Sequence, residues 1–155
     1  MSIASSGSAF ATASSRRKGR LVIVAAAVLA AAAVWSVVDP ILGIDLRSPA
    51  NGGRESMDVG PSLIVLAAAI ASFVGWAALA LLERLTSRAR VVWAVGASLL
   101  LLASLGAPLS GTGVTAANRA ALAVLHLAVG AVLIPGLVRT SPGPDRISPN
   151  TETGP

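Results

Sequence analysis

The chain has 155 residues, of which 54% are hydrophobic, 12% charged and 3% aromatic, and its formal net charge is +5. A domain of this size with so few polar residues cannot be an ordinary water-soluble protein. The sequence has no Cys, which excludes disulfides, iron–sulfur clusters and zinc sites with Cys ligands.

Four apolar segments are long enough to cross a membrane as helices. A spanning helix needs about 20 mostly apolar residues, because the hydrocarbon core of a bilayer is about 30 Å thick. The predicted spans are residues 21–38, 62–82, 91–107 and 117–138. None of these segments alternates apolar with polar residues as barrel strands do. The sequence therefore predicts an all-α fold, a four-helix transmembrane bundle over residues 16–140.

Before the first span lies a Ser-, Ala- and Gly-rich segment, residues 1–15, whose composition predicts a disordered tail. A basic stretch follows, ending at Arg20. A basic stretch before an apolar one is also the pattern of a cleavable signal peptide, with Ala31-Ala32-Ala33 as the cleavage site. We prefer a membrane span, because the apolar stretch is longer than the about 7–15 residues of a signal core and continues past Ala33.

The segment between the first two spans, residues 39–61, is the longest predicted loop. Its middle, Ser48-Pro49-Ala50-Asn51-Gly52-Gly53, has the composition of a turn. Before it stand the apolar residues Ile41-Leu42-Gly43-Ile44 and Leu46, which favour a return to the membrane interface or a cap on the bundle. An ordinary connecting loop is the simpler alternative.

A short polar segment between the second and third spans carries Glu83, Arg84, Arg88 and Arg90. The simplest interpretation is a charged cluster that keeps this turn in the cytoplasm. The alternative is a contact surface for anionic lipid headgroups or for a protein partner. Three arginines are fewer than the about four to eight basic residues of typical headgroup-binding clusters.

Two tryptophans, Trp35 and Trp93, lie near the ends of predicted spans. Indole side chains are amphipathic and are enriched at the headgroup level of membranes. We therefore expect both to anchor helix ends at the membrane interface.

The fourth span contains His126, the only ionisable residue predicted to lie near the middle of a span. Since the chain has one His and no Cys, a haem or metal site lacks further ligands, and no catalytic, cofactor-binding or metal-binding residue is predicted. Counting along each helix places Ser72, Ser98 and His126 near one level of the membrane. We expect His126 to point into the bundle and to form a hydrogen bond with Ser72 or Ser98.

The distribution of basic residues predicts the orientation, because positive residues near span ends are retained in the cytoplasm. On one side of the spans lie nine: Arg16, Arg17, Lys18, Arg20, Arg84, Arg88, Arg90, Arg139 and Arg146. The other side has three, Arg47, Arg54 and Arg119, with the acidic residues Asp39, Asp45, Glu55 and Asp58. Both termini are therefore expected in the cytoplasm, and residues 141–155 are predicted to form a second disordered tail.

Several short motifs occur in a recognisable order: Gly43-Ile44-Asp45-Leu46, Gly75-Trp76, Leu82-Glu83-Arg84, Arg88-Ala89-Arg90 with Trp93, Ser104-Leu105-Gly106-Ala107-Pro108 and His126-Leu127. Over residues 16–140 their order and spacing resemble a family of uncharacterised four-span membrane proteins from actinobacteria, defined only as a domain of unknown function. The resemblance implies an integral protein of the bacterial plasma membrane. It supplies no catalytic or ligand residues.

These observations predict a non-enzymatic accessory or interaction component of the bacterial plasma membrane. Its expected partners are the lipid bilayer and another membrane protein or a second copy of the chain. Nucleic acid is not among them, because membrane topology explains the positive charge. The alternative is a small oligomeric transporter or exporter that is not coupled through a buried carboxylate.

Overall fold

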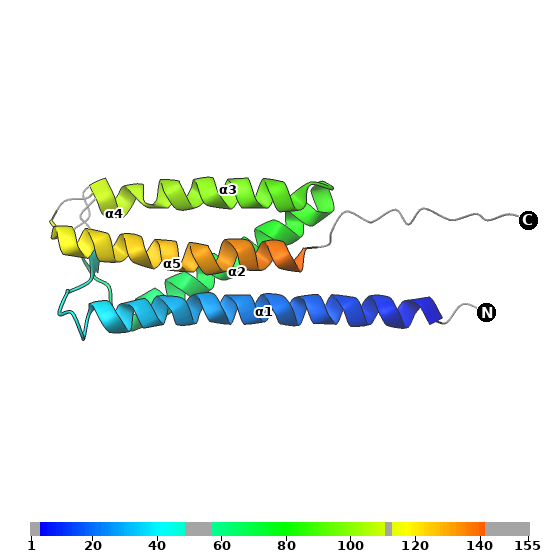
Figure 1. Cartoon of the computed structure of the whole chain (residues 1–155), viewed down its shortest axis with the longest axis horizontal. Coiled ribbons are helices and arrows are strands. Elements are labelled where there is room, and N and C mark those ends of the chain that lie inside the picture. Colours follow the sequence, from blue (N-terminus) through cyan, green and yellow to red (C-terminus); the bar gives the residue numbers. More distant parts are fainter. Residues whose placement is uncertain (1–3, 49–56, 111–112, 142–155) are drawn as a thin grey trace, which may run out of the picture.

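The computed structural model describes residues 4–48, 57–110 and 113–141, and these form five helices and two short strands (Figure 1). The helices are α1 (Ala4–Val38), α2 (Pro61–Leu85), α3 (Ala89–Ser104), α4 (Gly106–Ser110) and α5 (Ala116–Thr140). The strands β1 (Arg47–Ser48) and β2 (Met57–Asp58) pair antiparallel, with Arg47 opposite Asp58.

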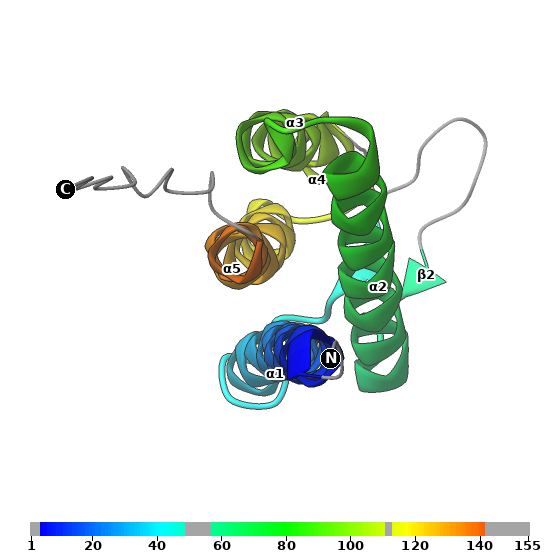
Figure 2. The ribbon, with the colours of Figure 1, turned by 90° about the vertical axis from the view of Figure 1, so that its right-hand side faces the viewer.

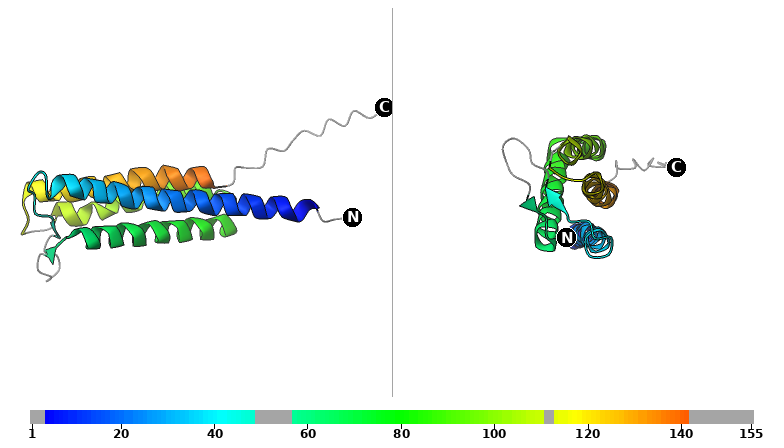
Figure 3. Two further views of the ribbon diagram at one scale, coloured as in Figure 1. Left: turned by 90° about the horizontal axis from the view of Figure 1, so that it is seen from below. Right: turned by 90° about the vertical axis from the view of Figure 1, so that its left-hand side faces the viewer.

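Four helical stretches are long and apolar enough to cross a membrane: Ser14–Val38, Pro61–Leu85, Ala89–Ser110 and Ala116–Thr140. The predicted all-α fold with four transmembrane helices is therefore confirmed. Each stretch contains a predicted span and extends beyond at least one of its ends. Because the number of crossings is even, the start of α1 and the end of α5 lie at the same end of the bundle (Figure 3).

The predicted disordered tail at residues 1–15 is wrong from Ala4 onward, since α1 begins there and continues without a break to Val38. Alanine has the highest helix propensity, and residues that extend an existing helix avoid the cost of nucleating a new one. The predicted tail at residues 141–155 lies outside the described residues, except for Ser141.

The third crossing is interrupted near its end, where α3 stops at Ser104 and α4 begins at Gly106. Pro108 explains the interruption, because a proline has no N–H to donate to the carbonyl four residues earlier and its ring crowds that carbonyl. The carbonyl concerned is that of Ser104, the last residue of α3. The predicted end of this span at residue 107 is therefore a bend, after which the helix continues for one more turn.

Helix α5 packs against α1 on one side and against α3 on the other (Figure 2). Helix α2 crosses the face of this layer: its start lies beside α1, and its end lies beside α3. One buried cluster, around Ile64 and Leu122, joins α1, α2 and α5. A second, around Leu79 and Leu137, joins all four crossings at the end that bears the start of α1. The core is therefore continuous along α5, while α2 and α3 separate toward the loop end.

Glycines allow the closest helix contacts. A Cβ atom placed on Gly136 would lie 2.7 Å from Cγ2 of Ile23 in α1. On Gly75, it would lie 3.1 Å from the ring of Trp93, which is only 8% exposed. The predicted interfacial anchor Trp93 is thus a core residue, because the missing side chain at Gly75 leaves room for its ring.

We expect Gly136→Leu to lower the free energy of unfolding by about 1–3 kcal/mol, because overpacking forces α1 and α5 apart. Gly96→Leu is the matched control, since nothing lies within 4 Å of a Cβ atom placed on Gly96. Unfolding in mixed micelles with increasing denaturing detergent measures both. Equal stability of the two variants would contradict the close α1–α5 contact.

Candidate functional site

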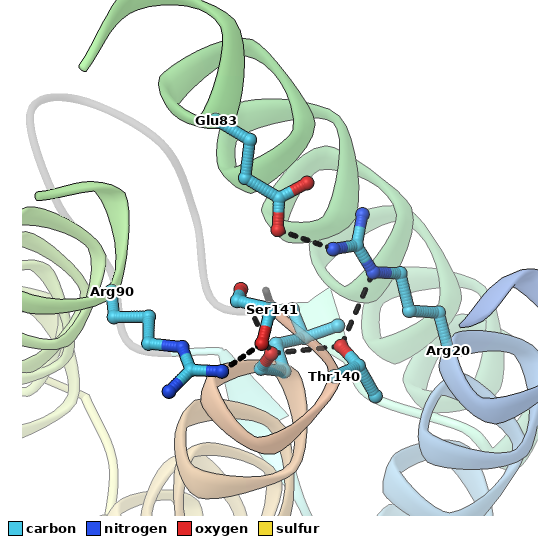
Figure 4. A network of polar contacts seen from close by, with 6 residues as sticks. Arg20, Glu83, Arg90, Thr140 and Ser141 are labelled. Atoms are coloured by element: carbon cyan, nitrogen blue, oxygen red, sulfur yellow. Dashed lines mark hydrogen bonds and ion pairs between the residues drawn. The ribbon is translucent and has the colours of Figure 1, made fainter. Parts of the chain in front are cut away.

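Polar side chains meet at the end of the bundle where α1 begins and α5 finishes (Figure 4). Arg20 of α1 forms an ion pair with Glu83 of α2, with 2.5 Å between Nη2 and Oε1. The two side chains are only 8% and 19% exposed. Nε of Arg20 also donates to Oγ1 of Thr140, the last residue of α5, at 3.2 Å. One arginine therefore connects three helices.

The fourth crossing joins this network through Arg90 of α3, whose Nη2 donates to the backbone carbonyl of Ser141 (Figure 4). The last carbonyls of a helix have no partner within the helix and carry partial negative charge, so a guanidinium stabilises them. Ser141 is buried, with 4% of its surface exposed. Arg20 and Arg90 therefore approach the end of α5 from opposite sides and fix it.

Basic side chains that the network does not use lie around it on the outside. They are Arg16, Arg17 and Lys18 of α1, Arg84 of α2, Arg88 of the α2–α3 turn and Arg139 of α5, and all six are exposed. We call this set the basic rim. The four residues predicted as headgroup or partner contacts are thus divided: Arg84 and Arg88 belong to the rim, whereas Glu83 and Arg90 are internal.

The opposite end of the bundle is held by Asn118, which is 2% exposed. The backbone N–H of Arg47 donates to its Oδ1 at 2.9 Å, and its Nδ2 donates to the carbonyl of Arg47 at 2.8 Å. The side-chain amide thus pairs with β1 as a neighbouring strand would. Sequence reasoning missed Asn118, although an amide in the first turn of an apolar helix was a usable signal.

This clamp places the first loop over the bundle. Leu46 is 2% exposed, and Ile44 packs against the same buried cluster, so these two residues form the predicted cap. Ile41 and Leu42 are largely exposed and are not part of it. The exposed side chain of Arg47 pairs with Asp58 at 2.7 Å. The turn predicted at residues 48–53 lies outside the described residues beyond Ser48.

Between the two ends, α2, α3 and α5 border an apolar groove of about 970 Å³. It exists because α2 leaves α3 as the two helices approach the loop end (Figure 2). Its walls are almost entirely apolar and include several small residues, among them Ala67, Ala71 and Ala78 of α2 and Gly96 of α3. His126 of α5 also lines it.

The structure does not join Ser72, Ser98 and His126 by hydrogen bonds as predicted. Ser72 is fully buried, and its hydroxyl donates to the carbonyl of Ala68 at 2.7 Å. Nδ1 of His126 lies 2.8 Å from the carbonyl oxygen of Leu122, and Ser98 is exposed. Two of the three side chains therefore find a partner one turn earlier in their own helix. Residue counting gave their depth but not the face on which each lies.

The described residues contain no group of three or more His, Asp and Glu side chains that could hold a metal ion. The polar groups form two structural clusters, one at each end of the bundle, and His126 stands apart from both.

We expect Glu83→Ala to lower the free energy of unfolding by about 3 kcal/mol, because it leaves the charge of Arg20 buried without a partner. Arg84→Ala, the exposed neighbour, should change the free energy of unfolding by no more than about 0.5 kcal/mol.

A double-mutant cycle tests the ion pair itself. The double variant Arg20→Met/Glu83→Met should be more stable than the summed effects of Arg20→Met and Glu83→Met predict. Additive losses in this cycle would show that the ion pair does not stabilise the bundle.

Comparison with protein families matched residues 11–143 to a family of unknown function, DUF6069. Comparison with curated proteins gave no match, nor did comparison with solved structures. The matched range includes all four candidate membrane-spanning helices, the network around Arg20 and the clamp at Asn118. The chain therefore belongs to DUF6069, a family of unknown function.

Proposed function

We propose that this protein is a non-enzymatic component of the bacterial plasma membrane that acts by binding other membrane constituents, with both termini in the cytoplasm. The observation that carries the proposal is the basic rim, six exposed positive side chains gathered at one end of a four-helix membrane bundle.

The orientation follows from the difference between the two ends. Among the described residues of the loop end, two basic residues, Arg47 and Arg119, stand beside Asp39, Asp45 and Asp58. Arg47 is already paired with Asp58. Because basic residues are retained in the cytoplasm, the rim marks the cytoplasmic end and the Asn118 clamp the outer end.

The rim has the composition of a surface that binds anionic headgroups. Clusters of about four to eight basic residues next to a membrane span attract anionic lipids, at about 1 kcal/mol for each charge near the surface. The α2–α3 turn alone falls short of this number. Folding brings six exposed residues from three parts of the chain together, while the internal network holds the helix ends that carry them.

The apolar groove also favours a binding role over a transport role. A solute path would run between the two ends and offer polar groups along its length, as the sites of transporters do. The groove is bordered by apolar walls from α2, α3 and α5. Solute flux in proteoliposomes tests the transporter alternative directly, and a protein-dependent flux would favour it.

Reporter fusions test the orientation. A fusion after Arg139 is expected to report the cytoplasm, and an insertion within residues 48–53 is expected to report the exterior. The two sites lie at opposite ends of the bundle because three spans separate them. An exterior signal from the Arg139 fusion would refute the proposed orientation. A mature chain beginning after Ala33, seen by intact mass, would restore the signal peptide interpretation.

We expect Arg84→Gln/Arg88→Gln to weaken the enrichment of anionic lipid around the protein by about 1 kcal/mol for each charge removed. Arg47→Gln/Arg119→Gln, which removes the same charge from the other end, is the control. The measurement is the lipid composition of polymer-excised membrane discs at low and high salt, since salt screens exposed charges. An equal effect of the two double variants would contradict headgroup binding by the rim.

A further inference from the structure

The apolar groove runs along most of the bundle. Its lining residues in α2 extend from Leu63 to Leu82, which at about 1.5 Å per residue is roughly 28 Å, close to the thickness of the hydrocarbon core. At the cytoplasmic end, residues 86–88 join α2 to α3 and hold the two helices together. Toward the loop end the helices diverge (Figure 2). The two helices that border the groove are therefore closest together at the cytoplasmic end.

None of the described residues that line this groove is charged, and its few polar side chains include His126 and Ser104. The hydroxyl of Ser104 is already engaged, since it donates to the carbonyl of Leu101 at 2.7 Å. His126 is engaged at one nitrogen only. The carbonyl of Leu122 can only accept a hydrogen bond, so Nδ1 carries the proton of the neutral ring.

This assignment leaves Nε2 of His126 with a lone pair, and no hydrogen bond from a described residue reaches it. Trp93, at the start of α3, also lines the groove, and its Nε1, a donor, has no partner either. The hydrocarbon core of the bilayer offers no donor, so an acceptor at this depth is stabilised by any O–H group brought to it. His126 belongs to the same region of the bundle as Ala68, because its neighbours Leu122 and Leu125 pack in one buried cluster with that residue. The apolar groove therefore extends along the bundle on both sides of His126.

We propose that this groove binds a neutral long-chain lipid that carries a hydroxyl within its chain, with the O–H donating to Nε2 of His126. A neutral ligand fits the uncharged lining, and apolar segments on both sides of the hydroxyl fit the groove on both sides of His126. The hydroxyl supplies the donor that neither the described residues nor the bilayer core provides. The volume of about 970 Å³ lies within the range of small-molecule sites, about 300–1,000 Å³.

A transmembrane helix from a partner fits the groove less well. Helices α2 and α3 converge toward the turn that joins them (Figure 2), where a rigid cylinder meets both helices. A flexible acyl chain can adapt its shape to the groove. The inference concerns the membrane interior and does not depend on the basic rim.

The single histidine of the chain allows a direct test. Protein labelled with ¹⁵N at histidine, purified without a histidine tag, is placed in phosphatidylcholine nanodiscs, where only His126 gives imidazole signals. The probe is hexadecan-8-ol, and hexadecane is its control. We expect the alcohol to move the Nε2 resonance upfield in a saturable way, as acceptance of a hydrogen bond does, and the alkane to leave it unchanged.

Two matched variants of α2 locate the effect. Ala71→Leu adds a side chain inside the groove, whereas Ala77→Leu makes the same change on an exposed position outside the lining. We expect the shift to be lost in Ala71→Leu and retained in Ala77→Leu.

Four results would overturn the proposal: an unchanged Nε2 resonance, a proton on Nε2 in place of Nδ1, an undiminished shift in Ala71→Leu, or a loss of the shift in Ala77→Leu. A fifth is an Nε2 shift that depends on the number of chains per disc and not on the alcohol. It would assign the groove to a second copy of the chain.

Discussion

Every polar group inside this bundle needs a partner within the protein, because the surrounding hydrocarbon provides none. The chain meets this requirement only in part, since the buried Nε1 atoms of Trp35 and Trp93 have no partner among the described residues. The groups that are satisfied find partners in two ways. At mid-depth, Ser72 and His126 bond to carbonyls of their own helices. At the ends, Arg20 with Glu83 and Asn118 with the backbone of Arg47 join segments that are far apart in sequence. The first solution leaves helices free to slide, and the second fixes their register.

Apolar packing then sets how closely the helices approach. Helix α5 lies between α1 and α3, and the glycines at 130 and 136 bring it against Leu101 and Ile23. Helix α2 is placed differently, since it contacts α1 near its start and α3 near its end. Two helices that meet at a short turn and then diverge leave a wedge between them. The groove is thus a consequence of the path of α2, not of missing side chains in a closed core.

Two surfaces remain for other molecules, and they differ in chemistry and in depth. The basic rim lies at the proposed cytoplasmic end, where headgroup charge and salt control its interactions. The groove lies between helices that are long and apolar enough to cross a membrane, where size and one hydrogen-bond acceptor would select the proposed ligand. A protein with both can contact a lipid surface and hold an apolar ligand at the same time. Both surfaces fit the proposed role as a binding component of the membrane.

The sequence by itself determined the fold class and the number of crossings, because span length and hydropathy depend only on local composition. It raised a cap formed by the apolar residues around Leu46 as an alternative to an ordinary loop, without deciding between the two. It could not assign partners to Glu83 and Arg90, whose contacts come from Arg20 and Ser141, 63 and 51 residues away. The sequence also could not show which face of each helix points into the bundle. The exposure of Ser98 and the burial of Trp93 were therefore missed. Tertiary structure decided these points, because which face of an apolar helix is buried depends on the neighbouring helices, and in lipid both faces are apolar.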